Sequence, residues 1–132
     1  MAAIDMAKYP VHLGRGGAAQ REPEFTGGME WYSGYGERHG ADGVDGRLVS
    51  MFSFKEPWDT WEMHPSGGEV VICTQGVIVM HQESPDGSRR TTTLRPGQYV
   101  INEPGVWHTA DVDAEATAVF ITSGLGTTVR PR

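Results

Sequence analysis

Four residues with metal-binding side chains lie in two short segments of the chain. Glu62 and His64 are two residues apart, Glu69 follows after the turn Pro65–Gly68, and His108 lies in a later segment. Residues two apart on a β-strand point to the same face, so Glu62 and His64 can share a site. Two imidazoles and two carboxylates are side chains that bind a divalent metal ion. The residue types therefore indicate a metal centre, provided that the fold brings the two segments together.

The position of Glu69 strengthens this interpretation. A Glu-x-His pair such as Glu62 and His64 is, in isolation, more often the solvent-facing side of an edge strand. Glu69, however, begins the apolar run Val70–Cys73. A carboxylate at the start of such a strand is costly to bury unless a cation or a hydrogen-bond donor compensates it.

The segments that must position these residues have the pattern of short β-strands. With 18 glycines and 8 prolines, the chain has many turn-forming residues, and Pro85 and Gly87 mark one strong turn. Strands at intervals of about ten residues, joined by such turns, predict a sandwich or barrel. The expected strands are 47–54, 58–64, 69–74, 77–82, 90–94, 98–102 and 117–122.

The N-terminal third has a different character. Residues 1–27 show no clear period and predict an extended arm, whereas Trp31 and Tyr35, four apart, favour a short helix over about 28–40. We expect one domain, in which residues 1–44 form the arm with its short helix and residues 45–132 form the barrel.

The two segments together resemble the two motifs of the cupin superfamily over roughly residues 45–123. The matching positions are His64, Glu69 and Gly76 in the first motif, and Gly97, Pro104, Gly105 and His108 in the second. The resemblance implies an all-β fold, a double-stranded β-helix (jelly-roll) barrel. It also implies one divalent metal ion, held in that family by three histidines and a glutamate.

The chain departs from the family pattern at Glu62, which stands where the first histidine is usual. Glu103 likewise replaces the first proline of the second motif. Glu62 is either a fourth metal ligand or a catalytic base beside the metal. Alternatively, its presence marks a lost metal site, in which case His64 and His108 are ordinary buried polar groups. Because Glu62 is itself a ligand type, we favour a retained site of Glu62, His64, Glu69 and His108.

The resemblance implies a metal-dependent enzyme that acts on a small organic molecule. Oxygenase chemistry is the best specific expectation, because two histidines and a carboxylate with open positions suit Fe(II). Isomerase, epimerase and lyase activities remain alternatives, as does a non-catalytic module that binds a small ligand. We expect the metal ion to be Fe, Mn, Zn or Ni.

Several further residues are candidates for the lining of a substrate pocket, namely Cys73, Tyr99, Asn102 and Trp107. Cys73 shares the face of Glu69, although a packing role is more common for such a cysteine. Asn102 precedes a turn, and we expect its side chain to bond the turn backbone rather than a ligand. Trp58 and Trp61 can also edge the pocket, but we favour packing roles for both.

Composition excludes several other classes of function. A net charge of −6 without a basic stripe argues against nucleic acid as a partner, and no apolar run is long enough for a membrane span. The single cysteine fits a reducing compartment, so we expect a cytoplasmic protein. The N-terminal arm needs a packing partner, and a homodimer would supply one.

Overall fold

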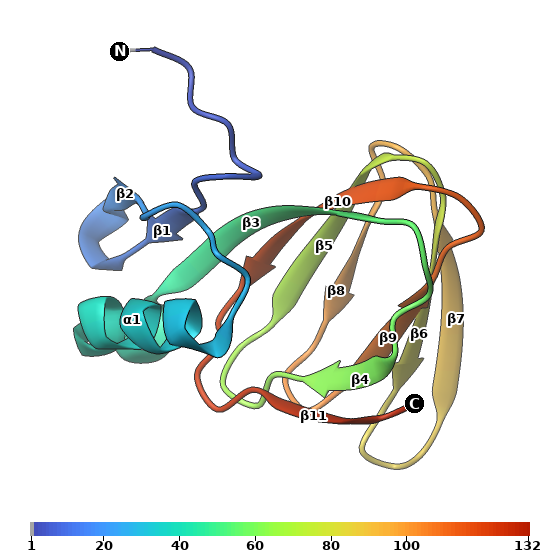
Figure 1. The fold of residues 1–132 in the computed structure, drawn as a ribbon. Coiled ribbons are helices and arrows are strands. Elements are labelled where there is room, and N and C mark those ends of the chain that lie inside the picture. The colour runs from blue at the N-terminus through green and yellow to red at the C-terminus, as the bar shows by residue number, and fades with distance from the viewer. Residues whose placement is uncertain (1) are drawn as a thin grey trace.

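Two antiparallel sheets face each other and enclose the core (Figure 1). The computed structural model describes residues 2–132, so Met1, the first residue of the expected arm, lies outside the described residues. The six-stranded sheet has the order β2-β1-β3-β10-β5-β8, with bounds β1 Val11–Leu13, β2 Ala19–Arg21, β3 Arg47–Phe54, β5 Glu69–Gln75, β8 Tyr99–Asn102 and β10 Ala116–Thr122. The five-stranded sheet has the order β11-β4-β9-β6-β7, with bounds β4 Thr60–Met63, β6 Ile78–Glu83, β7 Arg89–Leu94, β9 Trp107–Asp111 and β11 Thr128–Pro131. The expected all-β jelly roll is confirmed.

Strand alternation decides which side chains enter the barrel. On β5, Glu69, Val71 and Cys73 are buried, whereas Val70 and Ile72 on the opposite face keep exposed surface. The inward side chains of both sheets form one hydrophobic core, composed of Val71, Cys73, Ile78, Met80, Leu94, Ala110, Val112, Ala116, Ala118 and Phe120. Glu69 thus lies at one end of a strand whose other inward residues are apolar.

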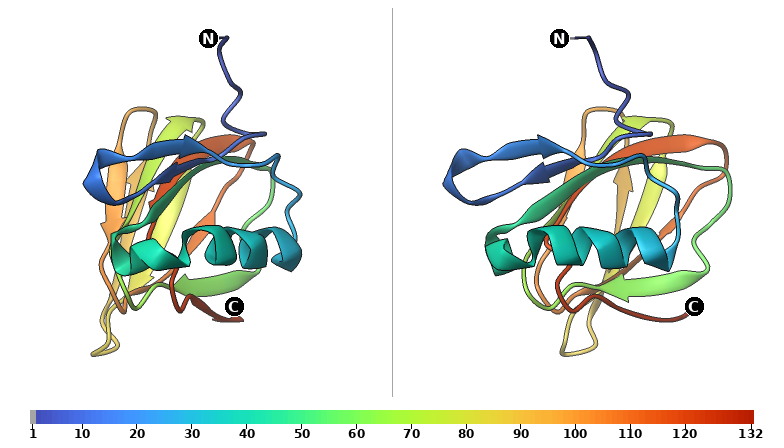
Figure 2. Two further views of the ribbon diagram at one scale, coloured as in Figure 1. Left: turned by 90° about the vertical axis from the view of Figure 1, so that its left-hand side faces the viewer. Right: turned by 60° about the vertical axis from the view of Figure 1, so that its left-hand side comes forward.

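The α-helix α1 spans Met29–His39 and lies beside the barrel (Figures 1 and 2). This confirms the short helix expected over about 28–40. Trp31 is the buried residue of the helix, and its indole N–H donates to the carbonyl of Pro23 at 3.3 Å. Among residues 2–132, no helix has the length and apolarity needed to cross a membrane.

The N-terminal segment is not simply extended, because it folds back as a hairpin of β1 and β2 that extends the six-stranded sheet through β3. A buried polar cluster ties this hairpin to the helix. Glu22 is 2% exposed and pairs with both Arg38 (3.0 Å) and His39 (2.8 Å). The ring of His39 stacks on that of His12, which in turn bonds Asp42 at 2.7 Å.

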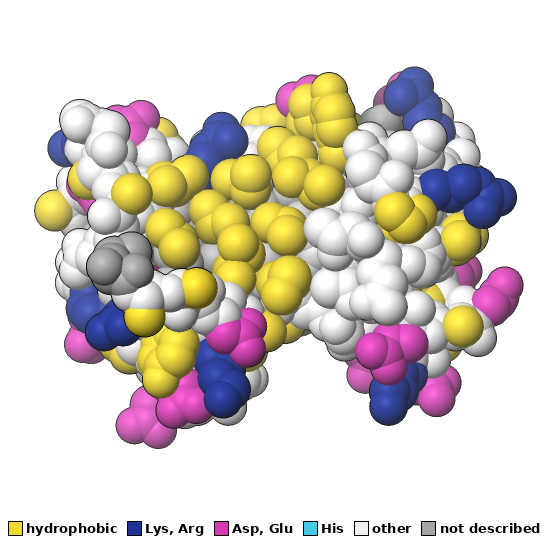
Figure 3. All heavy atoms as spheres, turned by 90° about the horizontal axis from the view of Figure 1, so that it is seen from above, with side chains coloured by type: hydrophobic (Ala, Val, Ile, Leu, Met, Phe, Trp, Pro, Cys, Tyr) yellow, Lys and Arg dark blue, Asp and Glu magenta, His cyan; other side chains and the backbone are white. Residues whose placement is uncertain are grey.

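The outer faces of the two sheets differ in chemistry. On the six-stranded sheet, cross-strand neighbours form two apolar rows, one of Val11, Val49, Ile121, Val70 and Ile101, the other of Met51, Val119, Ile72 and Tyr99. Figure 3, seen from the side on which β3 and β10 lie in Figure 1, shows a broad hydrophobic area. The five-stranded sheet instead carries ion pairs on its outer side, including Glu83 with Arg89 and Arg130.

Candidate metal centre

The structure brings the four predicted ligand residues together inside the barrel. Glu62 on β4 lies opposite His108 on β9, His64 directly follows β4, and Glu69 begins β5. His64 Nε2 and His108 Nε2 each lie 3.1 Å from a different oxygen of Glu69. One ligand atom each from Glu62, His64 and His108 lies within 4.8 Å of the others. Two separate stretches of the chain therefore converge because β4 pairs with β9.

Hydrogen bonds define the tautomer of each histidine. The hydroxyl of Thr127 donates to the carbonyl of Gly124 at 2.8 Å, so it accepts from Nδ1–H of His64, also at 2.8 Å. Nδ1 of His108 lies 3.3 Å from the carbonyl of Val106, which can only accept. In the neutral rings, both Nε2 atoms therefore carry a lone pair and no hydrogen. This is the arrangement that metal-binding histidines require.

Nε2 of His64 and Nε2 of His108 are both buried. Neither has a hydrogen-bond partner within residues 2–132. Each faces a carboxylate oxygen of Glu69, and this contact is unfavourable unless a cation lies between them. The ring centroids of His64 and His108 are 5.1 Å apart. Two imidazoles that bind one metal at about 2.1 Å with tetrahedral angles place their centroids about 5 Å apart, so the residues fit a shared ion.

Glu69 is held in place by neutral donors. Asn102 Nδ2 donates to Oε1 at 3.1 Å, and Thr122 Oγ1 donates to Oε2 at 2.6 Å. Gln82 in turn donates to Asn102 Oδ1 at 2.7 Å. Our expectation that Asn102 bonds the turn backbone was therefore wrong, because alternation on β8 points its side chain inward. Such outer contacts orient a ligating carboxylate.

The pKa values at the site favour positive charge between these groups. Burial alone would raise the pKa of Glu69, but His108 and His64 outweigh burial and hold it well below its usual range. Burial alone would lower the pKa of His108, but the contact with Glu69 outweighs it and raises that pKa. A proton or a metal ion at Nε2 is therefore stabilised, and at neutral pH a divalent ion competes for this position.

Glu62 occupies the solvent-accessible side of the site. Its side chain is 36% exposed, and Oε2 lies 3.9 Å from His108 Nε2. Burial and the charge of Glu69 raise its pKa, against the opposing effect of His108 and His64. Tyr32 of α1 belongs to the same surroundings, since burial and the charge of Glu62 raise the pKa of its phenol. Sequence analysis did not single out Tyr32.

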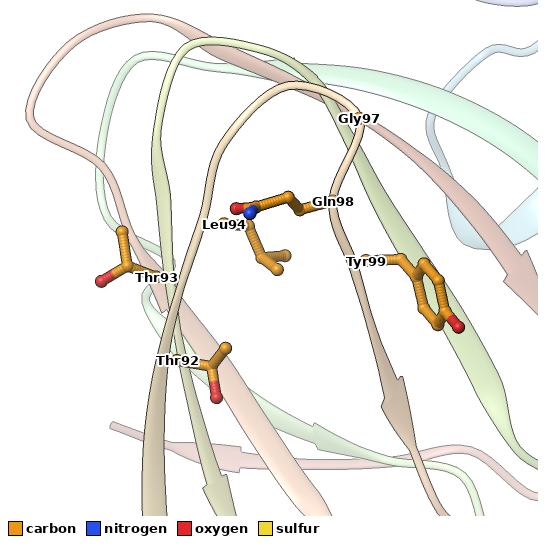
Figure 4. Close-up of a pocket in the computed structure, with 6 residues that line it drawn as sticks. All are labelled: Thr92, Thr93, Leu94, Gly97, Gln98 and Tyr99. Atoms are coloured by element: carbon orange, nitrogen blue, oxygen red, sulfur yellow. The ribbon is translucent and has the colours of Figure 1, made fainter.

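Three of the four predicted pocket residues do not reach the ligands. The Cys73 thiol lies in the core and faces backbone carbonyls. Trp107 points to the outer face, where its ring lies 4.5 Å from the guanidinium of Arg130. Tyr99 is 61% exposed and borders a surface groove near β7 (Figure 4). Trp107 is adjacent to the inward-facing His108 on β9, and Tyr99 lies three residues before the inward-facing Asn102 on β8. Strand alternation would therefore have placed both side chains on the outer face.

Thr122 and Thr127 are two further site residues that sequence analysis missed. Thr122 lies on the inward face of β10, together with Phe120. The only sequence signal for a role in the site was that a polar residue ends this apolar face. Thr127 lies 63 residues from His64 in a loop, and no local pattern links the two.

Comparisons with known proteins show a shared fold. No family model matches the chain, and no curated protein matches it. An oxalate oxidase structure aligns with a TM-score of 0.54 and 15% identity, covering 62% of this chain and 45% of that one. Hydroquinone 1,2-dioxygenase from Sphingomonas sp. TTNP3, solved with 4-hydroxybenzoate bound, aligns with a TM-score of 0.51 and 14% identity. The alignment covers 58% of this chain and 59% of that one.

A cupin-2 domain protein from Shewanella frigidimarina aligns with a TM-score of 0.48 and 20% identity, covering 65% of this chain and 71% of that one. The chain spans less than half the length of the oxalate oxidase that it matches. At these identities the likeness concerns the fold alone. The chain has the jelly-roll fold of the cupins.

Proposed function

We propose that this protein binds one divalent metal ion through His64, Glu69 and His108, with Glu62 at the accessible side. The observation that carries the proposal is the pair of buried Nε2 atoms that face the Glu69 carboxylate and have no hydrogen bond to any of the described residues. Imidazole and carboxylate donors together suit Fe, Mn, Zn or Ni.

The proposed activity is metal-dependent chemistry on a small organic molecule, with an oxygenase as the specific expectation. Two histidines and one carboxylate leave coordination positions open, and the similar structures include an oxidase and a dioxygenase. A bound metal would polarise an oxygen-bearing substrate. Thr127 orients His64, while Asn102 and Thr122 orient Glu69. Glu62 can take or return a proton at Oε2, because its side chain keeps exposed surface and Oε2 lies 3.9 Å from His108 Nε2.

Metal analysis of protein purified without an affinity tag or chelator tests the proposal. We expect close to one equivalent of metal, and its loss in His64→Ala and His108→Ala. His81→Ala is the matched control, because His81 lies on the outer face and bonds Asp111 at 2.7 Å. A protein that contains no metal and takes up none of Mn, Fe, Co, Ni or Zn contradicts the proposal.

Glu62→Gln, analysed for metal content and also for turnover, separates the possible roles of this residue. Loss of metal identifies a ligand, whereas retained metal with lost turnover identifies a base. Retained metal together with unchanged turnover removes Glu62 from the site.

A further inference from the structure

A hydrogen bond between the two sheets joins the neighbours of two proposed metal ligands. In the six-stranded sheet Glu69 pairs with Asn102, and in the five-stranded sheet His108 pairs with Gln82. Gln82 Nε2 donates to Asn102 Oδ1 at 2.7 Å and so connects these two pairs. Asn102 is 1% exposed, so its amide depends on protein groups rather than water for hydrogen bonds.

The backbone carbonyl of Ile101 sets the direction of this hydrogen-bond chain. Gln82 Nε2 donates to it at 3.0 Å, and a carbonyl oxygen can only accept. The nitrogen end of the Gln82 amide must therefore lie at this point, and its second hydrogen requires an acceptor. Asn102 Oδ1 is that acceptor. The nitrogen end of the Asn102 amide is consequently directed at Glu69 Oε1, which lies 3.1 Å away.

The opposite orientation of the Asn102 amide would be unfavourable. An ionised carboxylate can only accept, so Asn102 Oδ1 in place of Nδ2 would set two acceptor oxygens against each other in a buried site. Thr122 donates to Oε2 of Glu69 and cannot replace the donor at Oε1. The orientation of one buried amide therefore decides whether Oε1 is stabilised or repelled.

We infer that Gln82 is a positioning residue of the proposed metal centre. It holds the nitrogen of Asn102 toward Glu69 and thereby keeps the Glu69 carboxylate oriented for the metal. The inference rests on the proposed function for the bound ion, and it adds a residue that acts on the ligand through Asn102.

Two substitutions of Gln82 distinguish this role from simple support of the fold. In Gln82→Glu the side chain can only accept, so it takes the nitrogen of Asn102 and turns Oδ1 toward Glu69. We expect Zn²⁺ to bind about tenfold more weakly, as is usual when a group that orients a ligand is lost. Gln82→Met removes both hydrogen bonds but leaves Asn102 free to donate to Glu69, so the affinity should change less than about twofold. Competition against a chelator of known affinity measures both variants.

The sign of the change separates the orientation of the amide from an effect of charge. An added carboxylate attracts a cation, so charge alone would strengthen Zn²⁺ binding in Gln82→Glu. Gln98→Glu is the matched control, because it adds the same charge at an exposed position. It also preserves the side-chain oxygen that accepts from the N–H of Arg95 at 2.9 Å. We expect Gln98→Glu to bind Zn²⁺ with the native affinity.

The Asn102 amide can be observed directly. Asn102 is the single asparagine of the chain, so selective ¹⁵N labelling gives one side-chain amide signal in nuclear magnetic resonance spectra. In the metal-free protein we expect this signal to move in Gln82→Glu, because the nitrogen exchanges Glu69 for the introduced carboxylate. The signal should stay in place in Gln98→Glu.

Three results overturn the inference: native or tighter Zn²⁺ binding in Gln82→Glu, a loss of about tenfold in Gln82→Met, or an Asn102 signal that does not move in Gln82→Glu. The result for Gln82→Met does not depend on the folding of Gln82→Glu.

The signal of the metal-free protein also separates this inference from the proposed function. If the native protein takes up no metal but the Asn102 signal moves in Gln82→Glu, the proposed function fails and Gln82 still orients Asn102. If Gln82→Glu binds Zn²⁺ as the native protein does, the role of Gln82 fails and the proposed function stands.

Discussion

At the scale of single residues, the site depends on hydrogen bonds that fix the direction of lone pairs. Nε2 of His64 is directed at Glu69 only because Nδ1–H is held by Thr127. Thr127 can accept that hydrogen because its own hydroxyl hydrogen goes to Gly124. A loop threonine therefore determines which nitrogen of a buried histidine is available to a metal.

Thr127→Val is expected to weaken metal binding about 10- to 100-fold without unfolding the protein, since it removes the partner of His64 Nδ1 and nearly preserves side-chain volume. Competition against a chelator of known affinity measures the change. Thr128→Val, at the neighbouring exposed position, should retain the native affinity. Equal affinities for the two variants would show that Thr127 does not orient the ligand.

At the scale of elements, an ion pair and two cation–π contacts of Arg130 hold β11 on the five-stranded sheet. Arg130 lies over the rings of Trp61 (5.1 Å) and Trp107 (4.5 Å) and bonds Glu83 at 2.6 Å. Arg89 bonds the other oxygen of Glu83. β11 follows directly after the loop that holds Thr127, so this attachment also supports His64.

The attachment of β11 predicts a dependence of stability on pH. Hydrogen bonds from Arg130 and Arg89 hold the pKa of Glu83 below its usual value. Because the folded-state pKa is depressed, the stabilisation is present above the unfolded-state pKa, about 4.3, and is lost as pH falls through the folded-state pKa. We expect Glu83→Gln to lower Tm at pH 7 and to reduce the further loss of Tm below about pH 4.3.

Thermal unfolding between neutral and acidic pH measures this effect. Glu115→Gln is the matched control, since Glu115 forms only an exposed pair with Lys55 at 3.8 Å and should leave Tm nearly unchanged. An unaltered pH profile in Glu83→Gln would mean that the charged cluster does not stabilise β11.

At the scale of the whole molecule, the two outer faces suggest different surroundings. The five-stranded sheet carries ion pairs, as expected of a face in water, whereas the two rows on the six-stranded sheet hold no charged side chain. Contiguous apolar faces on proteins mark interaction sites, and these two rows, bordered by Arg21 next to Val11 and by Arg47 on β3, are compatible with a second copy of themselves across a two-fold axis. We propose a homodimer through this face, with the neighbouring arm, where Ile4 is 39% exposed, at its edge.

Ile121→Lys is expected to convert a dimer into a monomer, because it places a charge in the middle of the apolar face. Light scattering coupled to size-exclusion chromatography reports the mass against 14.4 kDa for one chain. Thr93→Lys, at an exposed position on the other sheet, should remain dimeric. A native protein that is monomeric at every concentration would contradict the proposal.

The sequence by itself determined the β-class, the short helix and the identity of the residues that could bind a metal. These follow from local rules, namely alternation along strands, turn residues and the cost of burying Glu69 beside apolar neighbours. The same alternation, applied further, would have placed Tyr99 and Trp107 on the outside.

Only the tertiary structure decided how those residues are arranged. Three contacts join positions far apart in the chain. They are the pairing of β4 with β9, the hydrogen bond between Thr127 and His64, and the hydrogen bond from Asn102 to Glu69. That Nε2 of His64 and Nε2 of His108 find no hydrogen-bond partner within residues 2–132 likewise becomes visible only when every neighbour is in place. Sequence spacing constrains neighbours along a strand, whereas the partner of a buried polar atom is set by packing between strands, and that packing defines the chemistry of this site.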